Sequence, residues 1–356
     1  MVASQSLSKQ ARRRRRIGAA AVAMLGLAAG ALPGVTTASA GPRATVVVDR
    51  YGFATPVSAA VYRSDLFIAN RANNSVTEVN AATGALIARL TSPAYRFSGP
   101  AAVLVSGTAV FVANTVGNSI TEFAAATRSL VRVIPGNGHR LNHPIAMTTT
   151  NGDLFVLNAA GSVAEFSIAN GRYVGIAAGS AYRFNHPASI TVADNHLFVT
   201  NGASNSVTEI SATSRAFIRS LSSSRFGFNH PSGVTAHGTT VWVANESGSS
   251  VTELSAVTGS LVRVVRNANL AMPGPIAYGD GYIFTASPPG SSPMVSQVVV
   301  STSTVTWMMC NTNGPYLFRN PQAVVVAGPR LWVVNAGGNS LTLMDATTGA
   351  LIKTVA

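Results

Sequence analysis

The chain has 356 residues, of which 47% are hydrophobic and only 10% are charged. This balance is too apolar for an intrinsically disordered chain and too polar for a membrane-embedded helical bundle. The formal net charge of +13 resembles that of a nucleic-acid-binding protein until the charges are located along the chain. Six positive charges lie in the first 40 residues, and the other 19 basic and 12 acidic residues leave +7, without any nucleic-acid-binding motif.

The first 40 residues predict a secretory signal peptide. Arg12 to Arg16 form a basic segment, the uncharged run from Ile17 to Leu32 is rich in Ala, Leu and Val, and Ala38-Ser39-Ala40 is a small-x-small cleavage pattern. An uncleaved anchor is the alternative, but the run is shorter than the roughly 20 residues that a spanning helix needs. We therefore expect a mature chain that begins at Gly41, is secreted or held at the cell surface, and is not transmembrane. The general secretory and twin-arginine routes both stay open.

The rest of the chain is a sevenfold repeat whose units are spaced 43 to 46 residues apart. Each unit begins at a proline: Pro56, Pro100, Pro144, Pro187, Pro231, Pro275 and Pro321. After the proline come a short apolar strand, a strand that ends in Asn in six units, a third strand that begins Ser-Val-Thr-Glu or similar, and a last apolar strand. β-Branched and aromatic residues between Gly, Asn and Ser turns predict one four-stranded antiparallel sheet per unit.

Seven such sheets fill residues 41–356 and predict one all-β domain, a seven-bladed β-propeller. An open solenoid is the alternative, but it needs polar capping repeats, and the first and last units are as apolar as the others. The second residue after each proline is small, which suits innermost strands that converge on a channel. The second residue of each second strand is aromatic, which suits the wider wedge between blades: Phe67, Phe111, Phe155, Phe198, Trp242, Phe284 and Trp332. Thr45 to Val48 are expected to extend the last blade beside Leu351 to Val355.

The repeat resembles those of the NHL and YVTN classes of β-propeller. The resemblance spans residues 41–356 and rests on Phe184-Asn185-His186-Pro187 and Phe228-Asn229-His230-Pro231, on strands ending Val-Ala-Asn, and on Thr-Gly turns such as Thr83-Gly84. It implies the propeller fold, which in these classes serves ligand-binding modules, protein-interaction scaffolds, and enzymes such as streptogramin B lyases and sugar lactonases. The NHL pattern usually has Asp where this chain has Asn at the end of the second strand. No catalytic residue of a family is therefore carried over.

Three histidines stand directly before the prolines of consecutive units: His143, His186 and His230. In a propeller, the segments before the innermost strands and the loops between the second and third strands open on one face, where ligands bind. Three imidazoles there predict a candidate site for zinc or another divalent ion. Hydrogen bonding of the turn before the proline is the structural alternative. No other cofactor is expected.

Arginines and tyrosines of the same segments form a second candidate site, for ligand binding: Tyr95, Arg96, Arg140, Tyr182 and Arg183. Arginine forks match carboxylate and phosphate groups, and tyrosine rings stack on sugars or apolar ligands. The alternative is a solvated rim whose neighbouring Phe and Leu residues pack into the core. The residual positive charge favours an anionic partner.

A glutamate recurs at one position of the third strand: Glu78, Glu122, Glu165, Glu209 and Glu253. Arg132, Arg219 and Arg263 each follow a glutamate by ten residues across a short hairpin, which predicts cross-strand ion pairs. Glu78 and Glu165 face Ala88 and Gly175 instead. They are therefore expected to lack a partner and are the better candidates for a catalytic acid.

The five positions after each proline contain one charged residue, Asp280. The groups that converge on the channel thus lack a carboxylate set for general base catalysis. The sequence favours an exported, monomeric, non-catalytic module that binds an extracellular ligand or protein, anionic or glycan in character. The alternative is an extracytoplasmic metal-dependent lyase or lactonase-type hydrolase that uses His143, His186 or His230.

Overall fold

The computed structural model describes residues 50–136, 140–270, 272–287, 293–311 and 315–356. The predicted signal peptide, the mature start at Gly41 and the proposed strand from Thr45 to Val48 lie outside these residues. Within the described part of the chain, no helix is long and apolar enough to cross a membrane.

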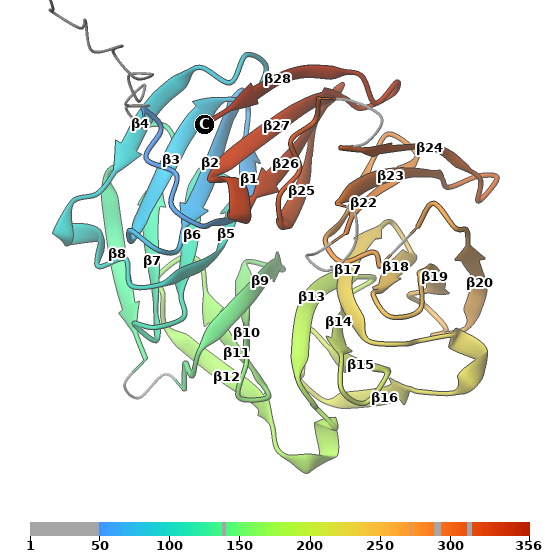
Figure 1. Ribbon diagram of the computed structural model, residues 1–356. Coiled ribbons are helices and arrows are strands. Elements are labelled where there is room, and N and C mark those ends of the chain that lie inside the picture. Colours follow the sequence, from blue (N-terminus) through green and yellow to red (C-terminus); the bar gives the residue numbers. More distant parts are fainter. Residues whose placement is uncertain (1–49, 137–139, 271, 288–292, 312–314) are drawn as a thin grey trace, which may run out of the picture. The chain divides into compact units, whose positions relative to one another are not determined.

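The described residues form seven four-stranded antiparallel sheets, each built from one sequence repeat (Figure 1). Blades 1 to 3 contain β1 (Pro56–Tyr62), β2 (Asp65–Asn70), β3 (Ser75–Asn80), β4 (Leu86–Leu90); β5 (Pro100–Ser106), β6 (Ala109–Asn114), β7 (Ser119–Ala124), β8 (Leu130–Pro135); and β9 (Pro144–Thr150), β10 (Asp153–Asn158), β11 (Ser162–Ser167), β12 (Tyr173–Ala178). Blades 4 and 5 contain β13 (Pro187–Ala193), β14 (His196–Asn201), β15 (Ser206–Ser211), β16 (Phe217–Leu221); and β17 (Pro231–His237), β18 (Thr240–Asn245), β19 (Ser250–Ser255), β20 (Leu261–Arg266). Blades 6 and 7 contain β21 (Ile276–Gly279), β22 (Tyr282–Ala286), β23 (Met294–Val299), β24 (Val305–Cys310); and β25 (Pro321–Ala327), β26 (Arg330–Asn335), β27 (Ser340–Asp345), β28 (Leu351–Val355). The predicted all-β seven-bladed propeller is confirmed.

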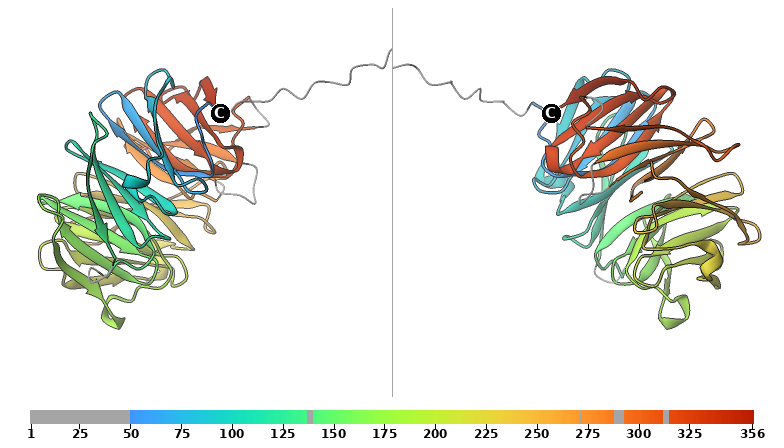
Figure 2. Two further views of the ribbon diagram at one scale, coloured as in Figure 1. Left: turned by 90° about the vertical axis from the view of Figure 1, so that its left-hand side faces the viewer. Right: turned by 45° about the vertical axis from the view of Figure 1, so that its right-hand side comes forward.

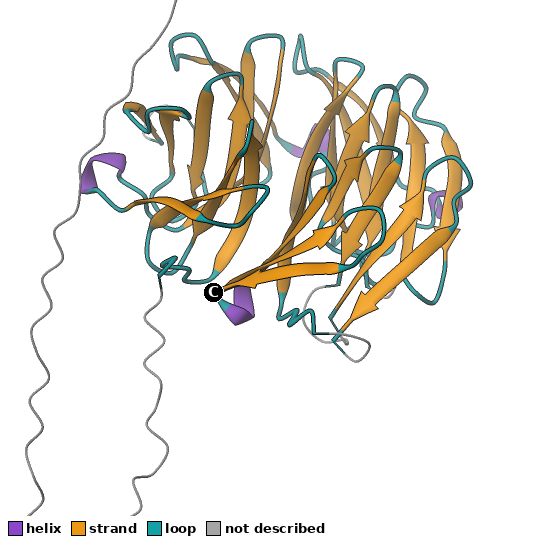
Figure 3. Ribbon diagram, turned by 90° about the horizontal axis from the view of Figure 1, so that it is seen from above, coloured by secondary structure: helices purple, strands orange, loops and turns teal. Residues whose placement is uncertain are grey.

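Helical structure among these residues is limited to short 3-10 turns, and strands joined by short loops dominate the view from above (Figure 3). Three of the turns lie in the segments that connect one blade to the next, and one follows β26: η1 (Pro93–Tyr95), η2 (Ser180–Tyr182), η3 (Ser224–Phe226) and η4 (Ala336–Gly338).

The core consists of apolar wedges between neighbouring blades. The seven predicted aromatic residues of the second strands are all buried, with at most 4% of the residue surface exposed. Phe67 of blade 1, for example, packs in one cluster with Phe123 of blade 2. At the channel the strands approach so closely that a Cβ on Gly233 would lie 2.2 Å from the carbonyl oxygen of Gly274. The small residues predicted near the axis are therefore required by backbone packing.

The last blade packs against the first, so the ring is closed (Figures 1 and 2). The backbone N–H of Thr55 donates to Asn339 Oδ1 of the last blade at 2.8 Å. The same bond, from the residue before the proline to an asparagine of the preceding blade, recurs at other junctions: Gly99 to Asn74, His143 to Asn118 and His230 to Asn205, each at 2.7 Å. Because the first-to-last junction uses the same bond as the internal junctions, the structure is a ring and not an open solenoid.

The asparagine that ends the second strand in six of the seven blades is buried and is a hydrogen-bond hub. Asn70 Nδ2 donates to Ser75 Oγ at 3.1 Å and to Thr77 Oγ1 at 2.9 Å, and Thr77 Oγ1 donates to the carbonyl oxygen of Tyr51 at 2.9 Å. The arrangement recurs in full at Asn114 and Asn245 and with close variations in other blades. A carboxylate has no hydrogen to donate, so this network explains why Asn replaces the Asp of the NHL pattern.

Candidate functional site

The two faces of the ring follow from the antiparallel strand order. Each first strand runs away from its proline, and each second strand returns toward that proline, where it ends in Asn in all blades except blade 6. The loops between second and third strands and the segments that connect successive blades therefore lie on one face, which we call the proline face. The turns between first and second strands and between third and fourth strands lie on the opposite face.

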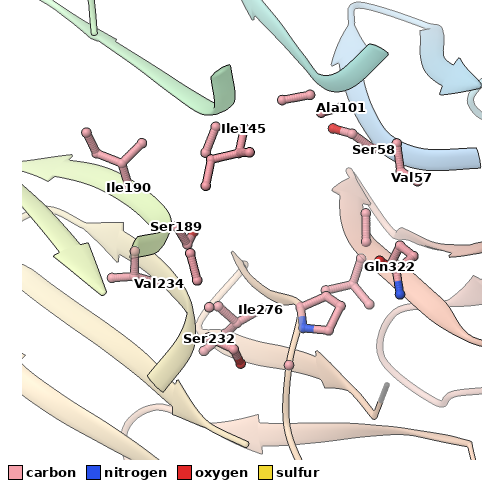
Figure 4. Close-up of a pocket in the computed structure, with 18 of the residues that line it drawn as sticks. Val57, Ser58, Ala101, Ile145, Ser189, Ile190, Ser232, Val234, Ile276 and Gln322 are labelled. Atoms are coloured by element: carbon pink, nitrogen blue, oxygen red, sulfur yellow. The ribbon is translucent and has the colours of Figure 1, made fainter. Parts of the chain in front are cut away.

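The mouth of the central channel opens on the proline face as a cavity of about 570 Å³. The first residues of the innermost strands of all seven blades line it, and Figure 4 shows Val57, Ile145, Ile190, Val234 and Ile276 among the lining residues. The walls combine small and aliphatic side chains with polar ones, because Ser58, Ser189, Ser232 and Gln322 line the same space. Such a cavity offers a ligand both apolar contacts and hydrogen bonds.

Two charged residues, Arg71 and Glu246, line the same mouth. They directly follow the hub asparagines of blades 1 and 5, which are not neighbours in the ring. Neither residue was predicted from the sequence as part of a site. The signal that marks them is charge at a repeat position that is uncharged in the other described blades: Thr115, Ala159, Gly202 and Ala336.

Glu246 is in contact with a histidine, whereas Arg71 has no acidic partner among the described residues. Glu246 Oε2 lies 3.2 Å from His230 Nδ1, and the two side chains are 23% and 53% exposed. Within the described residues, no carboxylate lies within ion-pair distance of Arg71. The mouth thus presents one available cation and one carboxylate above walls of aliphatic and small polar side chains.

The three predicted metal ligands stand on the proline face but do not converge. His143, His186 and His230 each have a left-handed backbone, with φ of 54°, 48° and 51°. The backbone N–H groups of His143 and His230 are bound by asparagines of the preceding blade. Within the described part of the chain, no group of three His, Cys, Asp or Glu residues is placed to hold a metal ion. This geometry favours the structural alternative for these histidines, a turn that positions the proline.

Tyr95 and Tyr182 serve the packing between blades. The Tyr95 ring stacks on Phe97 with centroids 5.1 Å apart, and its hydroxyl donates to the carbonyl oxygen of Arg128 at 2.5 Å. Tyr182 stacks on Phe184, and its hydroxyl donates to the carbonyl oxygen of a turn residue of the same blade at 2.7 Å. Equivalent stacked pairs are Tyr51 with Phe53, Phe226 with Phe228, and Tyr316 with Phe318. Because these rings are stacked and their hydroxyls bonded, they are poorly placed to stack on a ligand.

The predicted arginines remain accessible on the proline face. Arg96, Arg140 and Arg183 are exposed and share a left-handed backbone, with φ of 51°, 55° and 55°. None of the three forms an ion pair with a described carboxylate. They are the members of the predicted ligand site whose charged groups are available to a partner.

The three cross-strand ion pairs predicted on the blades are confirmed. Arg132, Arg219 and Arg263 place Nε 2.8, 2.8 and 2.6 Å from a carboxylate oxygen of Glu122, Glu209 and Glu253, respectively. These pairs lie within the blades, away from the channel mouth. They are therefore structural.

The prediction that Glu78 and Glu165 lack a partner is wrong. Arg128 and Arg215, each from the turn between the third and fourth strands of the next blade, bind these two carboxylates. The small residues opposite the glutamates leave the space that the guanidinium occupies: a Cβ on Gly175 would lie 2.4 Å from Arg215 Nε. Both glutamates are buried and paired, so neither is a catalytic acid candidate.

Burial raises the pKa of Glu78, Glu122, Glu165 and Glu209 above the ordinary value of 4.5, because desolvation outweighs the attraction of the arginines. The folded chain then binds these protons more tightly than the unfolded chain does. We therefore predict that the free energy of unfolding falls as the pH rises from about 4.5 through the raised pKa values. Urea unfolding midpoints measured across this range test the sign, with Glu209→Gln as a variant that flattens the slope. A stability that increases with pH over the whole range contradicts the prediction.

Comparison with known proteins supports the architecture alone. No family model and no curated protein matches the sequence. Among solved structures, a functionally unknown protein from Desulfotomaculum acetoxidans DSM 771 superposes with a TM-score of 0.65 at 11% identity, covering 83% of this chain and 96% of that one. The computationally designed Ika8 protein gives 0.61 at 12% identity, covering 85% and 88%, and the WD40 repeats of RRP9 give 0.59 at 12% identity, covering 72% and 80%. The chain is thus a seven-bladed β-propeller, and the resemblance to NHL and YVTN repeats is not extended to a family.

Proposed function

We propose that this protein is an exported binding module whose channel mouth receives an apolar ligand, or a side-chain-sized segment of a protein, that carries a carboxylate or phosphate. The observation that supports it is a cavity of about 570 Å³, lined by aliphatic and small polar side chains, together with Arg71, a cation without an acidic partner among the described residues. A guanidinium in that position binds an anionic group through two parallel hydrogen bonds. The same cavity collects no set of acids and bases from several blades, which favours binding over catalysis.

Titration of the purified domain with acetyl-dileucine, which carries one carboxylate and two aliphatic side chains, tests this proposal. We expect saturable binding that Arg71→Gln weakens by about tenfold or more, because a charge-assisted hydrogen bond is lost. Arg225→Gln removes an exposed arginine of the same face outside the cavity and should leave the affinity unchanged. Binding that is absent, or that both variants weaken equally, contradicts the proposal.

One observation favours the enzymatic alternative, a lyase or lactonase-type hydrolase. The contact between His230 Nδ1 and Glu246 Oε2 places a base and a carboxylate that orients it beside the cavity. Such a pair suits proton transfer, although the described residues provide no three-ligand metal site. Hydrolysis of dihydrocoumarin above the buffer rate, lost in both Glu246→Gln and His230→Ala, supports this alternative. Turnover that survives both substitutions contradicts it.

A further inference from the structure

The charges of the domain are segregated between its two faces. Among the described residues, the loops and connecting segments of the proline face carry seven arginines and one carboxylate, Glu246, a net charge of +6. The seven arginines are all exposed and come from six of the seven blades: Arg50, Arg71, Arg96, Arg140, Arg183, Arg225 and Arg319. The positive potential therefore surrounds the channel mouth instead of forming a patch at one edge.

The opposite face has the other sign. Its described turns and strand ends carry five aspartates and three arginines outside the buried glutamate pairs, a net charge of −2: Asp65, Asp153, Asp194, Asp280, Asp345, Arg63, Arg172 and Arg330. The five buried glutamates neutralise five further arginines between the faces. The residual positive charge is therefore concentrated on the proline face, and this face is the one that attracts an anionic partner.

The repeat places five of these cations at two shared levels. Arg96, Arg140 and Arg183 each stand four residues before the proline of consecutive blades and share one backbone conformation. Rotation about the channel axis relates successive blades, so equivalent positions lie in one plane perpendicular to that axis. Arg50 and Arg225 share a second such position, six residues before the proline. Exposed cations that are distributed around one face in this way can meet a flat anionic surface together, whereas a flexible polymer would cross only part of the face.

The other side chains of the proline face argue against single-stranded nucleic acid and against bilayer insertion. Proteins bind single-stranded nucleic acid by stacking its bases on exposed aromatic rings, and the tyrosines here are stacked and bonded between blades. Insertion into a bilayer requires a broad apolar face. Among the described residues, only Val116 and Leu317 are large, exposed hydrophobic residues in the loops of this face. Recognition by this face therefore rests on charge.

We propose that the proline face docks on the headgroups of an anionic lipid bilayer, with the arginine ring against the membrane surface. This surface surrounds the cavity on which the proposed function rests and shares Arg71 with it, whereas the other six arginines lie outside the cavity lining. Each arginine near such a surface strengthens binding by about fivefold, and salt screens the attraction. The channel mouth then faces the membrane.

Vesicle flotation tests this docking with the domain as it exists in solution. We expect the protein to float with vesicles of phosphatidylcholine containing about one-third phosphatidylglycerol at roughly 0.05 M salt, but not with phosphatidylcholine alone or at about 0.5 M salt. The triple variant Arg96→Gln, Arg140→Gln, Arg183→Gln should bind the anionic vesicles on the order of 100-fold more weakly. The matched control Arg63→Gln, Arg172→Gln, Lys353→Gln removes the same charge from exposed positions outside the loops of the proline face and should retain binding within about threefold.

Three results would overturn the proposal: no binding to anionic vesicles at low salt, equal losses in the two triple variants, or binding of inorganic polyphosphate through the arginines without binding of vesicles. The last result would assign the face to a soluble polyanion. Arg71 is unchanged in all of these variants, so acetyl-dileucine titration of the same proteins reports on the channel mouth independently. Thermal unfolding of each variant confirms that the fold is intact.

Discussion

The variant Arg215→Gly is expected to lose about 3 kcal/mol of unfolding free energy, because it leaves Glu165 buried without a cation. The Glu165 side chain is only 3% exposed, and Arg215 Nη1 lies 2.5 Å from its Oε2. Arg215 has a left-handed backbone, with φ of 63°. Glycine suits that conformation, so the loss reports the ion pair and not backbone strain. Chemical denaturation at neutral pH measures it.

Other blades show a second arginine position from which the stability of this variant can be restored. Each buried glutamate has one arginine, which comes either from its own fourth strand or from the turn of the next blade. Where the fourth strand supplies Arg132 or Arg219, the next turn has Gly171 or Gly259, whose missing side chain leaves room for the guanidinium.

Adding Gly175→Arg to Arg215→Gly reproduces the arrangement of those blades and should restore most of the lost stability. The control is Arg172→Gly. Arg172 is exposed, lies three residues before Gly175 and forms no ion pair with a described carboxylate, so this change should alter the free energy of unfolding by less than about 0.5 kcal/mol. If the double variant is no more stable than Arg215→Gly, an arginine at position 175 does not replace Arg215 as the partner of Glu165, and the prediction is wrong.

The fold could be predicted because the repeated pattern contains it seven times. Trp332 was predicted to lie between blades because it is the second residue of its second strand. Gly233 was predicted to lie beside the channel because it is the second residue after its proline. The cross-strand partner of Glu122 was also predictable, since Arg132 is ten residues away on the adjacent strand of the same hairpin. Relations inside one unit depend on local strand pairing, which sequence spacing determines.

Relations between units were not accessible in this way. The partner of Glu78 is Arg128, 50 residues away, and its reach depends on the spacing and twist of two blades. For the same reason the tyrosine of Tyr95-Arg96-Phe97 could not be assigned to the wedge between blades. Arg71 and Glu246 are 175 residues apart in sequence and share a cavity only because the ring closes. The candidate site depends on closure, a property of all seven repeats together.

Closure depends on Trp332, and the variant Trp332→Ala is expected to lose about 3–5 kcal/mol of unfolding free energy. The side chain is fully buried between the last and first blades, in one cluster with Phe53, Leu66 and Val355. Its Nε1 donates to the carbonyl oxygen of Ala81 in the first blade at 2.8 Å. Within the described residues, the chain connects every other pair of neighbouring blades covalently, so a defect here weakens the one junction that these residues hold by side-chain packing and hydrogen bonds alone.

The variant Trp332→Phe separates the hydrogen bond from the packing, and we expect it to cost about 1 kcal/mol more than Trp242→Phe, the same change at the equivalent position of blade 5. Hydrogen exchange locates the effect: protection should fall in β1 to β4 and β25 to β28 of the Trp332 variants, while β13 to β16 stay protected. Because the channel mouth needs residues from every blade, Trp332→Ala should also weaken acetyl-dileucine binding without touching the cavity. Protection lost evenly around the ring would show that the blades unfold as one unit and that no single junction controls closure.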